Sequence, residues 1–281
     1  MATASFRRVY VYLQTLSIDI VLGACAGMLF FARLVGAELN IILYVLLGLA
    51  VWCIYTFDHL LDARQIGSQA STFRHAFHQR HFKALSILLV VMGCLGLILA
   101  LIMLRIKYII GLGLGLGALI LLVFILFKVR PRQWAFLKEI FIATLYVGGI
   151  MLAPFFHRES QLVPADFWWL GSAYVLVAWF NSAYLGILDR ETDQKDGLYS
   201  LALRLGEPKS RKILRIILIL MLGYIASFYL WLGSFTYMHI SILLLIALVH
   251  AIAFLERDRH KDAIRRKLDG SFMLPFLLLL L

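Results

Sequence analysis

The stretch that decides the fold is ADFWWLGSAYVLVAWFNSAYLGIL, residues 165–188, which ends directly before Asp189. About 20 mostly apolar residues are enough for a helix to cross the hydrocarbon core of a bilayer. Comparable stretches recur along the chain, whose 281 residues are 62% hydrophobic and only 15% charged. A soluble domain averages about 25% charged residues. The sequence therefore predicts an all-α, multispanning transmembrane helical bundle rather than a soluble bundle of helices.

Nine hydrophobic segments are expected to form the helices of this bundle. They cover approximately residues 9–35, 40–58, 83–104, 108–127, 138–156, 165–188, 212–232, 236–255 and 271–281. At about 1.5 Å per residue, the last segment spans only about half of the hydrocarbon core, so it is either a partial helix or a helix cut short. No linker or change in composition divides the chain, and residues 1–281 are expected to form a single integral-membrane domain.

The basic residues indicate how the chain is oriented. It carries 27 Lys and Arg against 16 Asp and Glu, a net charge of +11. Such a charge would also suit nucleic acid, but in a membrane protein it is typical of basic loops on one side. The N-terminus and the loops after the second, fourth, sixth and eighth segments carry most of these residues. The positive-inside rule places them in the cytoplasm, at a plasma membrane of the bacterial type, and we expect lipid rather than nucleic acid as a partner.

Two groups of acidic residues lie at segment ends on that same side. The first is Asp58 and Asp62, and the second is Asp189, Asp193 and Asp196. Residues four apart share a helix face, so the carboxylates of each group converge and repel unless a cation lies between them. Hard oxygen ligands suit Mg²⁺, which shares its coordination shell with substrate phosphates. The sequence predicts a pair of Mg²⁺ sites that hold a diphosphate, with solvated interfacial acids as the alternative.

The residues around these acids resemble a known family. Residues 184–197, YLGILDRETDQKDG, followed by residues 201–206, LALRLG, closely resemble the second Asp-rich motif of the UbiA superfamily of membrane prenyltransferases. Residues 57–62, FDHLLD, resemble the end of its first motif. The resemblance implies a UbiA-like bundle of about nine helices. It also implies Mg²⁺-dependent transfer of a prenyl group from a polyprenyl diphosphate to an aromatic or otherwise lipid-soluble acceptor.

The first motif departs from the family pattern Asn-Asp-x-x-Asp-x-x-x-Asp. Ile54 and Tyr55 stand where the family has Asn and Asp, so two oxygen ligands are lost and Asp58 and Asp62 remain to hold one metal. The arginines that follow the motif in the family are displaced as well, and the nearest candidates are Arg74 and Arg80. This divergence leaves open a catalytically lapsed family member that acts as a lipid-binding or assembly protein.

The resemblance implies roles for individual residues. Mg²⁺ and cationic side chains stabilise the charge on the departing pyrophosphate, and a lipid-side cavity excludes water. The expected catalytic residues are Asp58, Asp62, Asp189 and Asp193. The expected metal ligands are these four and Asp196. The expected diphosphate contacts are Arg74, Lys138 and Lys195. Apart from the resemblance, intramembrane polar groups face the bundle interior by default, where Asp19 and Asn181 either line the cavity or form hydrogen bonds between helices. The cavity-lining candidates are Asp19, Asn181 and Tyr184.

Two further patterns are interpreted as structural. The histidines at 59, 75, 78 and 81 are expected to be solvated at the interface, because their spacing does not hold one helix face. Glycines at 111, 113, 115 and 117 form overlapping G-x-x-x-G pairs, which are typical of close helix packing in membranes.

A cation-coupled transporter is the alternative of another class. Transporter sites usually lie near the bilayer midplane on broken helices. The acids here lie at the cytoplasmic segment ends, which favours an enzyme that meets the head of a diphosphate.

Overall fold

The computed structural model describes residues 10–66, 70–103, 107–129, 137–160, 162–198, 200–256 and 261–280, and every regular element in these ranges is helical. The long helices are α2 (Ile18–Leu34), α3 (Ile41–Gln65), α5 (Phe82–Met103), α6 (Lys107–Val129), α8 (Lys138–Phe156), α9 (Ala165–Leu188), α12 (Glu207–Trp231) and α13 (Tyr237–Leu255). The short ones are α4 (Phe73–Arg80), α10 (Arg190–Asp196), α11 (Leu201–Leu205), α14 (Lys261–Ser271), η1 (Ser234–Thr236) and η2 (Leu274–Leu280).

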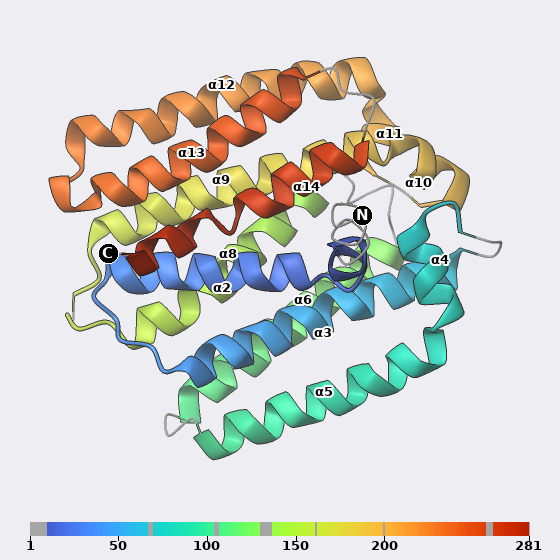
Figure 1. Cartoon of the computed structure of the whole chain (residues 1–281), viewed down its shortest axis with the longest axis horizontal. Helices are drawn as coiled ribbons and strands as arrows, with labels where there is room; N and C mark the ends of the chain where they lie inside the picture. Colours follow the sequence, from blue (N-terminus) through green and yellow to red (C-terminus); the bar gives the residue numbers. More distant parts are fainter. Residues whose placement is uncertain are drawn as a thin grey trace, which may run out of the picture.

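The all-α membrane bundle is confirmed. Among the residues that the structure describes, six helical segments are long and apolar enough to cross a membrane: α3, α5, α8, α9, α12, and η1 with α13. The long helices lie side by side along one direction in Figure 1. The apolar side chains of α5 are largely exposed, Val90 at 65% and Ile102 at 68% for example, as expected where a helix faces lipid.

The two ends of the chain differ from the expected segments. The first, 9–35, is interrupted: residues 10–15 are helical, but the chain turns at Ser17, which has φ 57°, before α2 begins. The last, 271–281, does not continue as an α-helix. Its first residue, Ser271, ends the amphipathic helix α14, and after a turn Leu274–Leu280 form the 3₁₀ helix η2. A hydropathy profile does not register α14, because a helix with one charged face averages to a polar segment.

The centre of the bundle is α9, which packs against α8, α12 and α13. Its inward side chains Phe167, Tyr174, Val177 and Phe180 are completely buried. The rings of Phe167 and Tyr174 touch Phe31 of α2, and the C-terminal end of α9 lies next to α10 and α11 (Figure 1). The same end of the bundle carries the C-terminal end of α3 and the cap helix α4, on the right in Figure 1.

A glycine in α2 allows the close packing of α2, α8 and α9. A Cβ at Gly27 would lie 2.9 Å from the Tyr174 hydroxyl oxygen and 3.1 Å from the Ile150 Cδ1 and Cγ2 atoms. By contrast, no described atom would come within 4 Å of a Cβ at the four α6 glycines. The close-packing interpretation of that G-x-x-x-G stripe is therefore wrong within the described chain, because α6 turns these glycines away from its neighbours.

We expect Gly27→Ala to lower the free energy of unfolding by about 1–3 kcal/mol, since the new methyl group must push buried atoms apart. Gly113→Ala is the matched control and should be neutral or slightly stabilising, because its surroundings are open and Ala favours the helix. Melting of the purified protein in detergent measures both changes. Equal melting temperatures for the two variants would contradict this account of the packing.

Candidate active site

The first acidic group sits at the C-terminal end of α3. Asp58, His59 and Asp62 each offer one ligand atom, and these atoms lie within 4.8 Å of one another. The helix explains this convergence, because positions 58 and 62 share a face and position 59 lies beside them. The two carboxylates suit Mg²⁺, whereas an imidazole suits transition metals better. The donor set of α3 therefore fits a divalent cation on the two oxygens.

The histidines are buried, so the interpretation of them as solvated is wrong for three of the four. His59, His75 and His78 expose only 5%, 5% and 1% of their surface. His59 Nε2 lies 3.2 Å from Ser17 Oγ, at the left-handed turn before α2. Its buried Nδ1 has no hydrogen-bond partner among the described residues. Sequence spacing missed this because α4 folds back over α3 and covers these side chains.

The second acidic group begins where α9 ends. Asp189 terminates α9, and its backbone carbonyl accepts from Asp193 N at 2.8 Å, so the chain continues into α10. Both carboxylate oxygens of Asp189 lie 2.5 Å from Arg265 Nη2 on α14. A second ion pair joins the same elements, from Lys261 to Glu191 at 2.9 Å. Sequence reasoning missed Arg265, because a basic run in a loop was interpreted as topology-setting charge.

Electrostatics connect the two acidic groups. Burial raises the pKa of Asp193 to about 7, and the like charge of Asp189 adds to the shift. Lys138, at the start of α8, opposes it, and Asp62 of α3 raises it further. The structure therefore brings Asp62, Asp189 and Asp193 into one field, with the expected cation Lys138 beside them.

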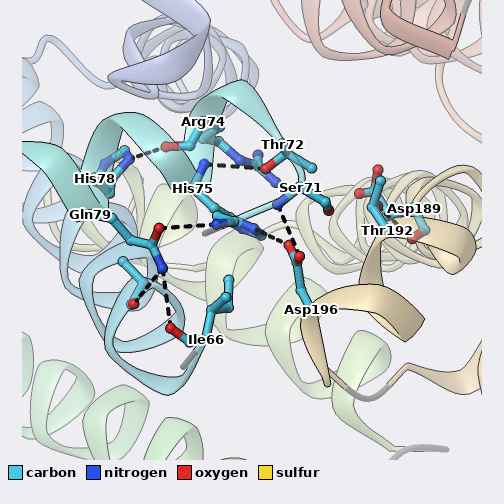
Figure 2. Close-up of polar contacts among 12 residues, drawn as sticks. Ile66, Ser71, Thr72, Arg74, His75, His78, Gln79, Asp189, Thr192 and Asp196 are labelled. Atoms are coloured by element: carbon cyan, nitrogen blue, oxygen red, sulfur yellow. Dashed lines mark hydrogen bonds and ion pairs between the residues drawn. The ribbon is translucent and has the colours of Figure 1, made fainter. Parts of the chain in front are cut away.

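Asp196 makes contacts of a different kind. Its Oδ1 accepts from Ser71 N at 3.0 Å, and its Oδ2 lies 3.3 Å from His75 Nδ1 (Figure 2). Thr72 caps α4 by accepting from His75 N through its hydroxyl at 3.2 Å. Both oxygens of Asp196 thus connect α10 to the N-terminal end of α4, rather than to the acids of α3.

Gln79 fixes the other end of α4 to α3. Its amide nitrogen donates to the carbonyl oxygens of Ala63 and Ile66, each at 3.2 Å, and its amide oxygen accepts from Ala70 N at 3.1 Å (Figure 2). Together with Asp196, these bonds hold α4 over the end of α3. They determine where the side chains of α4 point.

Arg74 is the side chain that α4 brings to the acids. Burial and the neighbouring guanidinium of Arg265 lower the pKa of Arg74. The carboxylates of Asp189, Asp62 and Asp269 oppose that shift, so Arg74 lies in the field of both acidic groups. Sequence reasoning expected Arg74 here. The third expected cation, Lys195, is exposed on α10, where its charge helps to lower the pKa of Glu191.

The intramembrane polar candidates divide into two groups. Asp19 is 3% exposed, and its Oδ2 has no hydrogen-bond partner within the described ranges. Asn181 Oδ1 lies 3.3 Å from His250 Nε2. Tyr184 instead donates to the carbonyl oxygen of Ala253 at 2.9 Å, which fastens α9 to α13. Asp19 and Asn181 are therefore polar groups of the interior, whereas the Tyr184 hydroxyl is used in helix packing.

Asp269 is an acid that sequence reasoning missed, and it lies in the field of Arg265 and Arg74. Burial raises its pKa, while Arg265 and Arg74 oppose the shift. Lys261, Arg265 and Asp269 are spaced by four along α14, so they share one face of that helix. The only signal in the sequence was this spacing within a segment interpreted as a loop.

Known proteins resemble this chain in sequence and in fold. The family model described as the UbiA prenyltransferase family matches residues 21–276. A comparison with curated proteins found no match. A UbiA homologue from Archaeoglobus fulgidus bound to GPP and Mg²⁺ is similar in structure, with a TM-score of 0.68 and 13% identity over 96% of this chain and 99% of that chain.

Two further structures are similar. A UbiA homologue from Aeropyrum pernix K1, in its apo form, gives a TM-score of 0.64 and 16% identity over 94% of this chain and 99% of that chain. A structure of digeranylgeranylglyceryl phosphate synthase gives a TM-score of 0.55 and 15% identity over 96% of this chain and 98% of that chain. At these identities the likeness establishes the fold.

Proposed function

The chain belongs to the UbiA prenyltransferase family, and from this premise we propose that it transfers a prenyl group from a polyprenyl diphosphate to a lipid-soluble acceptor. The observation that carries the proposal is the meeting of both acidic groups with Arg74 at one end of the bundle. Acids alone would repel a diphosphate. Acids together with a metal and partly buried guanidinium groups would bind it.

Asp58 and Asp62 would hold Mg²⁺, with Asp189 and Asp193 facing them from the second motif. The ligand atoms of α3 within 4.8 Å of one another support this, and one similar structure contains GPP and Mg²⁺. When bound, Mg²⁺ neutralises charge on the leaving diphosphate oxygens. In the same proposal, Asp196 holds α4 in position through Ser71 and is a positioning residue.

The cationic side chains would contact the diphosphate directly. Arg74 offers a planar set of N–H donors, which suits phosphate oxygens, and Lys138 adds a second charge near Asp193. Lys195, which is exposed on α10, would raise the local concentration of the anionic donor. The buried aromatic core of α9 supports water exclusion, which an allylic cation needs if it is to reach the acceptor.

We place the site on the cytoplasmic side and treat residues 1–281 as one domain. The support for the orientation is the excess of Lys and Arg in loops at the end of the bundle that carries α4 and α10. A lapsed enzyme is the second candidate, and the observation in its favour is the pair Ile54 and Tyr55, where the family pattern has oxygen ligands. Its function would then be lipid binding.

Incubation of the purified protein with Mg²⁺ and prenyl diphosphates of several lengths tests the proposal. We expect pyrophosphate release with at least one donor in the presence of Mg²⁺, and none after chelation. Donor binding without release, for every length and with a panel of lipid-soluble acceptors, would identify the lapsed enzyme. Absence of both binding and release would contradict the family function for this chain.

A further inference from the structure

The contact between Arg265 and Asp189 lies within the candidate metal site. Arg265 Nη2 is 2.5 Å from both carboxylate oxygens, and the two side chains expose only 17% and 30% of their surface. An arginine guanidinium stays charged in a protein, so this contact is an ion pair. A charge-assisted contact of this kind is short and strong.

The surrounding helices hold Arg265 in that position. Leu268 and Ile264 of α14 are buried in the core, and Lys261 on the same face pairs with Glu191 at 2.9 Å. The position of Arg265 is therefore set by the docking of a whole helix, and not by a single flexible side chain. A cation on Asp189 would have to displace it or share the same two oxygens at close range.

The other charged side chains near Asp189 favour the binding of an anion at this site. Arg74 lies on α4, which Asp196 ties to α10 through Ser71, and Arg265 contacts Asp189, so the fold brings two like charges to the same end of the bundle. Two guanidinium groups held close together suit a ligand of high negative charge, and a diphosphate is such a ligand. In addition, Tyr55 replaces an acid, so the first motif offers less negative charge for metals.

Building on the proposed function, we propose that Arg265 takes the place of one of the two expected divalent cations. Arg265 keeps its ion pair with Asp189 and donates its other N–H groups to the diphosphate. The site then needs a single divalent cation, held from α3 by Asp58 and Asp62. Arg265 would be a substrate-binding residue of the reaction that lies outside both Asp-rich motifs.

Counting bound Mn²⁺ by electron paramagnetic resonance tests this, with the purified full-length protein and a prenyl thiodiphosphate that reacts slowly. We expect one tightly bound Mn²⁺ in the unchanged protein and two in Arg265→Gln, whose Asp189 is freed. Lys261→Gln is the matched control: it removes the neighbouring ion pair of α14 and should still bind one. Detergent melting curves verify that all three proteins are folded.

Asp189→Asn gives an independent test if Arg265→Gln does not fold. Because Asp189 holds no metal in the proposal, Asp189→Asn should keep one Mn²⁺, whereas Asp62→Asn should lose it. Two Mn²⁺ in the unchanged protein, or loss of the single ion in Asp189→Asn, would overturn the role of Arg265 and leave the proposed function standing. No bound Mn²⁺ in any variant would overturn both proposals.

Discussion

Asp62→Asn is expected to lower the rate of pyrophosphate release by about 10³-fold or more at saturating donor and Mg²⁺. The amide keeps the shape of the side chain but loses the charge that holds a divalent cation next to Asp58. Since Asp62 also acts on Asp193 of the second motif, its loss changes the field on both sides of the site. Initial rates of release, measured with the donor that the unchanged protein prefers, give the effect.

Asp166→Asn is the matched control for that loss. Asp166 lies in the first turn of α9, at the end of the helix away from Asp189, and takes no part in the site. Its substitution should leave the rate within about twofold of the unchanged protein, as expected for a surface change away from buried features. Near-normal release by Asp62→Asn, with metal binding intact, would remove the α3 metal site from the mechanism.

The sequence predicted the bundle because hydrophobic length is a local property. The segment 165–188 coincides with α9, and 138–156 coincides with α8. The structure deviates from the predicted segments where the average hydropathy of a segment hides a local feature of the chain. The turn at Ser17 breaks an otherwise uniform apolar run, and α14 has its apolar residues on one side only.

The site was predictable only where its residues belong to motifs. Asp58, Asp62, Asp189 and Asp193 could be found from their spacing, since helix geometry places residues four apart together. Arg265 could not, because its contact with Asp189 joins residues 76 positions apart. Nothing local to α14 marks Arg265 as different from its basic neighbours, and the docking of that helix decides which of them reaches the acids.

Asp196 is a second case in which sequence spacing could not predict the contacts of a side chain. Its spacing from Asp189 predicted a metal ligand, but the structure gives its oxygens to Ser71 N and the His75 ring of a segment 125 and 121 positions away. Residues Arg190–Asp196 form the helix α10, which ends at this acid. What the spacing could not specify is which element would cover that helix face.

Arg74→Gln is expected to change affinity for anions and cations in opposite directions. Without the guanidinium, the donor loses charge-assisted hydrogen bonds worth about 1.5–3 kcal/mol, so the KM for the donor should rise about 10- to 100-fold. In the absence of donor, removal of a positive charge beside Asp62 and Asp189 should strengthen Mn²⁺ binding. Steady-state kinetics measure the first effect and paramagnetic resonance the second.

The opposite signs separate a diphosphate contact from a structural role. A merely unfolded or loosened α4 would weaken both donor and metal binding, because the end of α3 packs under that helix. Arg80→Gln, on the same helix but exposed, should change neither affinity by more than about twofold. If Arg74→Gln weakened Mn²⁺ binding together with donor binding, Arg74 would be a support of the α4 cap, and the diphosphate would have to rely on Arg265 and Lys138.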